Sequence, residues 1–317
     1  MTERLVIVDA APADDALEQA WQSLEQFGEL TVYPRSTPKE ALERVQRATA
    51  IFSNKVAISE QLLAAAPELR YVGILATGID HVDRAACRAR NVAVANVPGY
   101  SGAGVAQWVF AALLEVWNGI ADHSRAVADG AWERSPDFSF FTQPIIELQG
   151  RTLVILGAGD IGARVTRIAE AFGMQVIAAQ VPGRAPSADR MPLAEALAQA
   201  DVVSLHCPLT EQTARMVNAE FLAACKPGAV LINSGRGALL DDAAVVAALD
   251  SGHLSAACLD VLAPEPPPPG HVLVAHPKAL VTPHIAWGST DSRKRLIAEA
   301  AANFAAFQAG ERRNRVD

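Results

Sequence analysis

Short β-rich runs alternate with helix-length segments along almost the whole chain, and this alternation constrains the fold more than any other feature. In the first third, a helical pattern at residues 14–27 follows the first run, and the runs are RLVIVD, LTVY, ATAIFS, LRYVGIL and VAVANV. Strands that are separated by helices pair in parallel, and a parallel sheet is covered by helices on both faces. The chain is therefore predicted to be an α/β protein.

A second alternation follows a long apolar helix predicted at residues 103–118 and a polar, aromatic connection, DGAWERSPDFSFFTQPIIELQG. Its predicted strands are Thr152–Leu156, Gln175–Ala179, Asp201–His206, Ala229–Asn233, Ser255–Leu259 and Leu280–Thr282. The last predicted helix, residues 292–309, lies beyond this set and has to pack elsewhere. We therefore predict two Rossmann-like, doubly wound parallel-sheet domains, with a dinucleotide-binding domain (101–284) inserted into a substrate domain (1–100 and 285–317).

Composition limits the classes of function. The chain has 317 residues, 50% hydrophobic and 20% charged, as in ordinary globular proteins. Its net charge of −8 argues against nucleic acid or an anionic membrane as a partner. No apolar segment approaches the length of a membrane span, and the N-terminus does not read as a signal peptide. Because the four cysteines form no CxxC pair, we expect no metal site and a reducing, cytoplasmic location.

A glycine-rich turn joins the first strand of the second alternation to a helix. In LVILGAGDIGARV, Gly157, Gly159 and Gly162 match G-x-G-x-x-G, directly after an apolar strand and directly before an amphipathic helix. The first glycine permits a tight turn, the second lets a pyrophosphate approach the backbone, and the third lets helix and strand pack closely. The pattern predicts a dinucleotide site, and the competing interpretation is a plain strand–turn–helix connection.

Gln180 occupies the position after the second strand of this unit, 18 residues beyond Gly162, where an acidic residue commonly holds the ribose. A carboxylate there would repel a 2′-phosphate, whereas an amide would not. Arg184 lies close enough in sequence to reach such a phosphate if the VPGR loop turns back, and it is otherwise a solvated loop residue. We therefore expect NADP or NAD as the cofactor, with tolerance or preference for NADP.

Three further residues follow strands of the second unit and suggest catalysis. Arg236, between two glycines in NSGRGALLDD, is suited to grip a carboxylate with two hydrogen bonds, although a surface ion pair is the ordinary alternative. Glu265 lies in the proline-rich loop after Asp260, and His284 follows Pro283 in TPHIAWGS. A carboxylate beside an imidazole favours the protonated ring, which suits a histidine that donates a proton.

With these residues in view, the chain resembles the D-isomer-specific 2-hydroxyacid dehydrogenases over nearly its whole length. The resemblance rests on ordered motifs, and its last pieces are most similar to the glycerate dehydrogenase (hydroxypyruvate reductase) branch. The matching pieces are ATGIDHVD, NVPGYSGAGVAQW, LGAGDIG, LHCPLTEQT, CKPGAVLINSGRGALLDD, LDVLAPEP, TPHIAWGS and NFAAFQAGERRNRV.

The resemblance implies a role for each matching position. Arg236 would bind the substrate carboxylate and keto oxygen, His284 would be the acid in reduction and the base in oxidation, and Glu265 would orient it. Asp260 would meet the nicotinamide carboxamide. The backbone of Ala76, Thr77 and Gly78 would hold the substrate carboxylate, with Arg236 and His284. The expected cofactor-binding residues are Gly157, Gly159, Asp160, Ile161, Gly162, Gln180, Arg184, Cys207, Pro208, Thr213, Ser234 and Asp260.

The expected function is hydride transfer between NAD(P)H and a small 2-keto acid, with hydroxypyruvate and glyoxylate reduced to D-glycerate and glycolate. The open alternatives are a bulkier 2-keto acid, phosphite or formate as substrate, or a non-enzymatic, dinucleotide-sensing protein similar to a corepressor. The family also implies a homodimer. The chain departs from the family pattern at Gln107, Trp108 and Gly235, which are expected to be structural or tolerated, and at Gln180.

Overall fold

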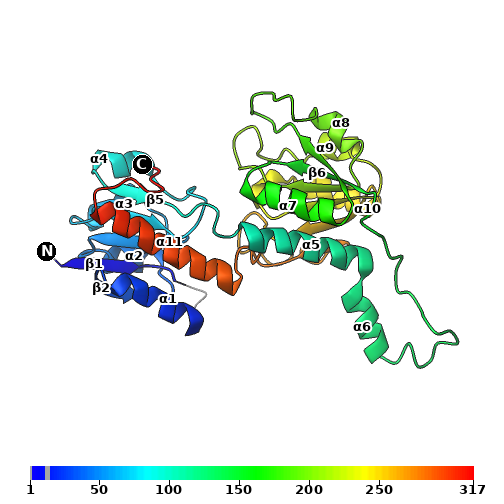
Figure 1. Ribbon diagram of the computed structural model, residues 1–317, viewed down its shortest axis with the longest axis horizontal. Coiled ribbons are helices and arrows are strands. Elements are labelled where there is room, and N and C mark those ends of the chain that lie inside the picture. The colour runs from blue at the N-terminus through cyan, green and yellow to red at the C-terminus, as the bar shows by residue number, and fades with distance from the viewer. Residues whose placement is uncertain (1, 11–14) are drawn as a thin grey trace. The chain divides into compact units, whose positions relative to one another are not determined.

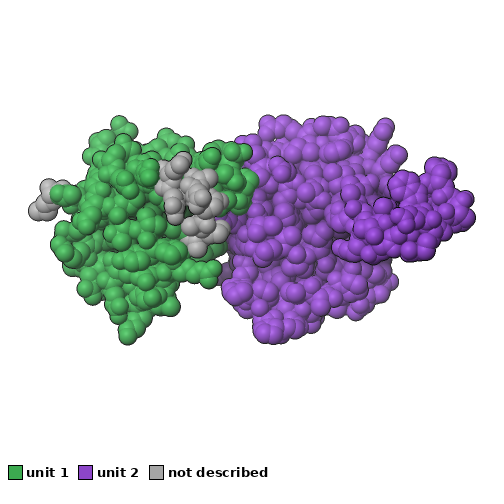
Figure 2. All heavy atoms as spheres, turned by 90° about the horizontal axis from the view of Figure 1, so that it is seen from below, with its two compact units in different colours: residues 1–101, 288–317 green, residues 102–287 purple. Residues whose placement is uncertain are grey.

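A computed structural model describes residues 2–10 and 15–317. Contacts within the chain divide it into two compact units, which are coloured separately in Figure 2. Unit 1 comprises residues 1–101 and 288–317, and unit 2 comprises residues 102–287. Unit 2 is therefore inserted into unit 1, and each unit is an α/β layer structure around its own parallel sheet (Figure 1).

Unit 1 contains a five-stranded, all-parallel sheet in the order β2-β1-β3-β4-β5. The strands are β1 (Glu3–Ile7), β2 (Gly28–Val32), β3 (Ala50–Ser53), β4 (Tyr71–Ile74) and β5 (Ala93–Ala95). Most of their residues are buried, because a parallel sheet carries helices on both faces.

The helices of unit 1 cover these two faces. Helices α2 (Pro38–Arg44), α3 (Glu60–Ala65) and α4 (Arg84–Ala89) share a hydrophobic cluster with alternate residues of the central strands, such as Ile51 and Val72. Helix α11 (Thr290–Gln308) packs against α1 (Asp15–Glu25) and β4, where Phe304 contacts the rings of Phe52 and Tyr71. The segment after the insertion thus completes the core of unit 1.

Unit 2 contains a six-stranded, all-parallel sheet in the order β11-β10-β9-β8-β6-β7. Its strands are β6 (Thr152–Leu156), β7 (Gln175–Ala179), β8 (Val202–Leu205), β9 (Ala229–Asn233), β10 (Leu254–Leu259) and β11 (Ala279–Val281). The order reverses between β6 and β8, which defines a topological switch point where doubly wound sheets bind ligands.

Side chains of these strands alternate between two hydrophobic clusters. Leu153 and Ile155 pack against α5 (Gly102–Asn118) and α7 (Asp160–Ala171), whereas Val154 and Leu156 face the opposite cluster. That cluster contains residues of α8 (Leu193–Leu197), α9 (Ala219–Ala224), η1 (Gly237–Leu239) and α10 (Asp242–Asp250). Helix α6 (Ile120–Ala128) and the loop after it lead away from the body of unit 2 (Figure 1).

The two-domain, doubly wound fold predicted from the sequence is confirmed, and each predicted strand coincides with an observed one to within about two residues. The alternation was decisive because every buried strand is bounded by polar or glycine-containing turns. Helix α6 was not anticipated. Within the described part of the chain, no single helix has the length and apolar composition of a membrane span, and only the pair α5 and α6, bent by 53°, passes that test together.

Candidate active site

The carboxyl edge of the six-stranded sheet gathers the residues that the sequence singled out in unit 2. Because all six strands are parallel, the segments after β6, β8, β9, β10 and β11 emerge at the same edge. These segments carry, in chain order, the glycine turn, Cys207 and Pro208, Arg236, Asp260 and His284. Residues that are far apart in the sequence therefore lie at one edge, because the strands that precede them run parallel in one sheet.

The glycine turn has the backbone that the motif requires. Gly157 has φ +107°, and a Cβ there would lie 2.6 Å from the carbonyl carbon of His206. A Cβ on Gly162 would lie 2.1 Å from the carbonyl oxygen of Gly157, so only glycine allows this close helix–strand packing. A Cβ on Gly159 would meet nothing within 4 Å, and this residue caps α7 without a side-chain hydrogen bond. The N-terminal amides of α7 are therefore available to an anionic group.

Two buried polar atoms near this edge also fit a bound dinucleotide. The Oε1 atom of Gln180 and the Oγ atom of Ser234 are buried, and neither has a hydrogen-bond partner among the described residues. Buried polar atoms in folded proteins normally have partners, so two unpartnered atoms that directly follow strands β7 and β9 fit a ligand with hydroxyl groups at this edge. The residues present therefore suit a dinucleotide.

The loop after β7 folds back on itself through Gln180. Its side-chain amide donates to the carbonyl oxygens of Arg184 (2.9 Å) and Ala185 (3.2 Å). Gly183 has φ +77°, and a Cβ there would lie 3.0 Å from the side chain of Gln212. The loop therefore turns toward the segment after β8, which includes Cys207.

The remaining predicted cofactor residues surround this turn. Burial raises the pKa of the Cys207 thiol to about 11, and the charge of Arg184 acts in the opposite direction. The hydroxyl of Thr213 is buried and donates to the carbonyl of Pro208 (2.8 Å), so it shapes the loop. Asp160 forms an ion pair with Arg164 (3.0 Å), and Ile161 packs against the cluster of α5 and α7.

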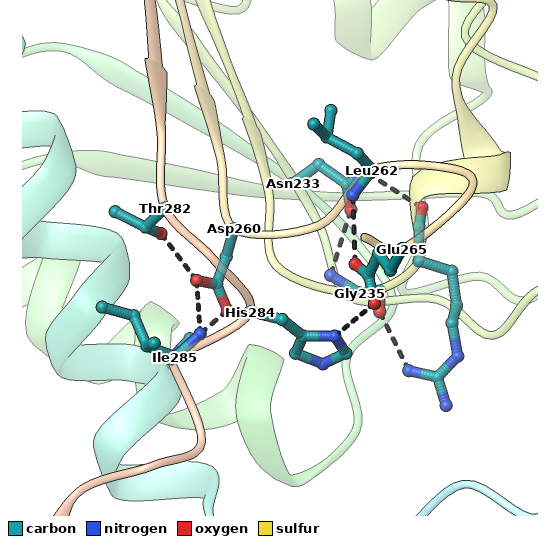
Figure 3. Close-up of polar contacts among 10 residues, drawn as sticks. Asn233, Gly235, Asp260, Leu262, Glu265, Thr282, His284 and Ile285 are labelled. Atoms are coloured by element: carbon teal, nitrogen blue, oxygen red, sulfur yellow. Dashed lines mark hydrogen bonds and ion pairs between the residues drawn. The ribbon is translucent and has the colours of Figure 1, made fainter. Parts of the chain in front are cut away.

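His284 and Glu265 form a close pair of titratable side chains at this edge. His284 Nδ1 lies 2.7 Å from Glu265 Oε2, as Figure 3 shows, and both side chains are partly exposed. The other carboxylate oxygen, Oε1, accepts from the amide of Leu262 (3.1 Å). Since a carboxylate accepts, Nδ1 carries the proton, and the opposite ring nitrogen, Nε2, is the one that can exchange a proton with another molecule.

Asp260 lies one residue beyond β10 and is 1% exposed. Its carboxylate accepts from the Thr282 hydroxyl (2.6 Å) and from the amides of Ile285 and Ala286 (2.8 Å each), and its carbonyl accepts from the His284 amide (2.8 Å). Burial raises the pKa of this carboxyl, while the hydrogen bonds and the charge of His284 act in the opposite direction. Figure 3 shows the contacts of this carboxylate with Thr282 and Ile285.

Arg236 lies in a loop that is packed tightly against the segment carrying Glu265. The side chain of Asn233, at the end of β9, donates to the Arg236 carbonyl (2.9 Å) and accepts from the Gly235 amide (3.0 Å). A Cβ on Gly237 would lie 2.0 Å from the carbonyl carbon of Leu262. A glycine at 237 therefore lets the arginine loop and the glutamate loop meet.

Sequence reasoning missed two residues that shape this site, Asn233 and Thr282, whereas the glycines on either side of Arg236 already suggested the close backbone approach seen at Gly237. Asn233 is fully buried at the end of a strand, and a polar residue at the end of an apolar strand, two positions before Gly-Arg-Gly, was an available signal. Thr282 precedes Pro-His, but nothing in its neighbourhood indicates a partner 22 residues earlier. Among the described residues, no cluster of three or more His, Cys, Asp or Glu side chains suited to a metal ion occurs.

Ala76, Thr77 and Gly78, expected to bind substrate, follow β4 at the carboxyl edge of the other sheet. The Thr77 hydroxyl donates to the Val97 carbonyl (3.0 Å), and its carbonyl accepts from the side chain of Asn96 (2.7 Å). Thr77 is exposed. The loop is thus ordered within unit 1, and its assignment to substrate stays a prediction.

Comparisons with known proteins agree with this geometry. Residues 110–286 match the family model described as "D-isomer specific 2-hydroxyacid dehydrogenase, NAD binding domain". The chain is 37% identical to a hydroxypyruvate reductase of Blautia hydrogenotrophica, over 92% of both chains. It is 35% identical to a glycerate dehydrogenase of Methylorubrum extorquens, over the full length of both.

Solved structures show the same two-unit fold. The TT0316 protein of Thermus thermophilus superposes with a TM-score of 0.87 at 36% identity, covering 99% of this chain and 100% of the other. An NADPH-dependent glyoxylate/hydroxypyruvate reductase of Sinorhizobium meliloti, solved with NADP and malonate, gives 0.84 at 28% identity, covering 100% and 97%. The chain therefore belongs to the D-isomer-specific 2-hydroxyacid dehydrogenases and is an NAD(P)-dependent oxidoreductase that acts on small 2-keto and 2-hydroxy acids.

Proposed function

We propose that this enzyme reduces hydroxypyruvate and glyoxylate to D-glycerate and glycolate. The observation that carries the proposal is the 2.7 Å contact between His284 and Glu265, next to the Arg236 loop at one sheet edge. The choice of substrate rests on the relatives, which are named as hydroxypyruvate, glyoxylate and glycerate enzymes.

In this proposal, the nicotinamide cofactor supplies the hydride when it is bound. His284 holds a proton at Nε2 for the substrate oxygen and takes it back in the oxidation direction. Glu265 accepts from Nδ1, which fixes the ring orientation and stabilises the charged ring. Arg236 binds the carboxylate and the keto oxygen, where its positive charge stabilises the developing alkoxide.

We assign the dinucleotide to unit 2 and the remaining substrate contacts to unit 1. The glycine turn, the amides that begin α7 and the orphaned Oε1 and Oγ atoms of Gln180 and Ser234 would hold the dinucleotide. The backbone of residues 76–78 would bind the substrate carboxylate. Water would be excluded when the reactants are enclosed.

A kinetic panel tests the substrate assignment. Hydroxypyruvate, glyoxylate, pyruvate and a bulky 2-keto acid are each assayed with NADH and with NADPH. The rate is followed by the loss of the absorbance band of the reduced nicotinamide. Hydroxypyruvate or glyoxylate should give the highest kcat/KM. A preference for the bulky acid would overturn the substrate proposal and leave the enzyme class intact.

The His284→Ala variant tests the catalytic role directly. We expect kcat to fall by about 10²–10⁴-fold, since general acid catalysis typically contributes that much. His253→Ala is a matched control, because this histidine contacts the Leu222 carbonyl at 2.8 Å and lies at the opposite, amino end of β10. A near-normal rate for His284→Ala would refute the assignment.

For the cofactor, we propose that NADPH is accepted and favoured. The support is the neutral Gln180 in place of an acid and the loop that carries Arg184, which folds back onto Gln180 and approaches Gln212 at Gly183. Arg184→Ala should raise KM for NADPH several-fold more than KM for NADH, with little change in kcat. Equal effects on both cofactors, or a strong preference of the wild type for NADH, would contradict the proposal.

We also propose that the enzyme is a homodimer, in line with its family, and that an arm formed by residues 119–146 of unit 2 contributes to the interface. The arm is internally ordered: the His123 ring contacts the Gly119 carbonyl (2.7 Å) and the Thr142 amide (3.1 Å). Yet Phe138 is 91% and Phe141 69% exposed. Ordered, exposed aromatic side chains are typical of an interface.

Sedimentation equilibrium tests the dimer. The wild type should sediment as a dimer, and Phe138→Ser with Phe141→Ser should shift the equilibrium toward monomer. Phe172→Ser, at a 44% exposed phenylalanine outside the arm, is the control. A monomeric wild type would refute the proposal.

We further propose a cytoplasmic location, which the four buried, unbridged cysteines favour.

A further inference from the structure

We propose that Thr282 is a positioning residue that acts through Asp260 to hold His284 in its reactive pose. The inference rests on the proposed role of His284 and adds to it a residue to which neither the motif nor the family resemblance gives a task. The structural observation is a chain of hydrogen bonds from the Thr282 hydroxyl through the Asp260 carboxylate to the backbone on the far side of His284.

His284 has a backbone conformation that needs external support. Its φ is +54°, in the left-handed region that residues with a side chain rarely adopt. Such a conformation persists when surrounding contacts fix it, and it occurs often at functional sites. The left-handed turn sets the direction in which the imidazole leaves the backbone, and therefore whether Nδ1 meets Glu265.

Asp260 supplies that support from both sides of the turn. Its backbone carbonyl accepts from the His284 amide, and its carboxylate accepts from the next two amides, those of Ile285 and Ala286. Three consecutive amides are therefore bound to one residue. Rotation of the backbone at His284 would break at least two of these hydrogen bonds.

Thr282 fixes the carboxylate itself. Its own backbone is held by the sheet, since its amide donates to the carbonyl of Leu259 at 2.9 Å. Its hydroxyl donates to Asp260 Oδ1 at 2.6 Å, and the same oxygen accepts from Ile285. Without this hydroxyl, the carboxylate would be held only by the two loop amides that it positions, so the hydroxyl is the contact that fixes its plane from outside the loop.

Two other tasks of this network have to be weighed against positioning. Burial raises the pKa of the Asp260 carboxyl, so keeping it ionised has a cost in stability. The resemblance also implies a contact between Asp260 and the nicotinamide carboxamide. That contact stays a prediction and is compatible with positioning, because the chain supplies three of the roughly four hydrogen bonds that a carboxylate accepts.

The test is Thr282→Val, which keeps the shape of the side chain and removes the hydroxyl. We expect kcat to fall by about 10- to 100-fold, as for a small misplacement of a catalytic group. KM for the keto acid and the Kd of NADPH, measured by protein fluorescence, should stay near wild type. Thr282→Ser retains the hydroxyl and should recover most of the lost kcat.

A second threonine separates positioning from general destabilisation. Thr49, buried in unit 1, accepts from the Arg4 amide at 2.9 Å and donates to Glu3. Thr49→Val should lower the melting temperature and leave kcat near wild type. If Thr282→Val has wild-type kcat, or if Thr282→Ser fails to recover activity, the positioning role is wrong.

The His284→Ala variant distinguishes the two possible failures. If it keeps a near-normal rate, the proposed catalytic role of His284 is wrong, and the positioning role of Thr282 is wrong as well. If it is inactive while Thr282→Val has wild-type kcat, only the positioning role fails. A loss of NADPH binding in Thr282→Val, with kcat unchanged at saturating cofactor, would assign Asp260 to the cofactor and overturn the inference.

Discussion

The two sheets use the same device at their carboxyl edges, an aspartate just beyond a strand whose carboxylate accepts three hydrogen bonds from a distant loop. In unit 1, Asp9 accepts from the amides of residues 54–56 at 2.5–2.8 Å. In unit 2, Asp260 accepts from Thr282, Ile285 and Ala286. Both aspartates tie a loop that follows one strand to the end of a neighbouring strand.

The loops that they hold differ. Residues 54–56 have no positive φ, whereas the loop held by Asp260 includes His284 at φ +54°. We call each aspartate, with the loop groups that donate to it, a clamp. The clamp of unit 1 holds a loop without a positive φ, whereas the clamp of unit 2 holds a strained residue that carries a proposed catalytic side chain. The comparison teaches that the same hydrogen-bond pattern can serve stability in one place and the pose of a reactive group in another.

Among changes to these loop contacts, the largest expected effect comes from breaking the clamp of unit 2. Asp260→Asn puts an N–H group where the loop amides need an acceptor, so the turn at His284 should relax. We expect kcat to fall by about 100-fold, comparable to a small misplacement of the reacting groups. Steady-state kinetics with saturating NADPH measures this, and a variant with wild-type kcat would show that the clamp does not pose His284.

The matching change in unit 1 should affect a different quantity. Asp9→Asn leaves at least one loop amide without its acceptor, which we expect to lower the free energy of unfolding by about 1–3 kcal/mol. Urea unfolding, followed by circular dichroism, measures this, and kcat should stay near wild type. If Asp9→Asn reduced kcat as strongly as Asp260→Asn, the distinction between the two clamps would collapse.

The strands and the catalytic candidates in this comparison were predictable from the sequence, but the contacts that hold the two loops were not. The strands were recognisable because β-rich runs end at turns, and His284, Glu265 and Arg236 stood out because each follows a strand of one sheet. The left-handed turn at His284 and the hydroxyl of Thr282 were not visible. Both depend on a contact between segments 22 residues apart, which exists only once β10 and β11 are paired. Whether residues 76–78 meet substrate remains a prediction.

A third clamp, at Gln180, exchanges donor and acceptor, because here the side chain donates to the loop. We expect a smaller effect from changing it. Its amide donates to the carbonyls of Arg184 and Ala185, where Asp9 and Asp260 accept from loop amides. Gln180→Glu would place a carboxylate against these carbonyl oxygens. Because Arg184 and Ala185 are exposed, water can replace the lost donor, and we expect a loss of only about 0.5–1.5 kcal/mol in stability, the net contribution of an ordinary hydrogen bond.

The same variant bears on cofactor choice. An acid at this position is usually associated with NADH, but here the loop needs a donor, so Gln180→Glu should lose NADPH affinity without gaining in kcat/KM with NADH. Gln180→Ala, which removes the donor without adding charge, separates the two effects. A gain with NADH in the glutamate variant would show that the loop tolerates an acceptor.

The smallest expected effect is the pH dependence of stability, whose sign should differ between carboxylates of the two units. In unit 1, ion-pairing with Arg315 lowers the pKa of Asp317 to about 2 from 3.8, so its stabilisation is present above pH 3.8 and is lost as pH falls toward 2. In unit 2, burial raises the pKa of Asp260 above 3.8. Its contribution is therefore full below pH 3.8 and declines as pH rises through the raised pKa.

Unfolding free energies of wild type, Asp317→Asn and Asp260→Asn, measured in urea from pH 3 to pH 7, test this sign. The advantage of wild type over Asp317→Asn should grow with rising pH by about 1 kcal/mol or less, since solvent screens the pair. The advantage over Asp260→Asn should shrink over the same range. If both changed in the same direction, the ionised Asp260 would be a net stabiliser, and its clamp would differ from that of unit 1 only in the loop that it holds.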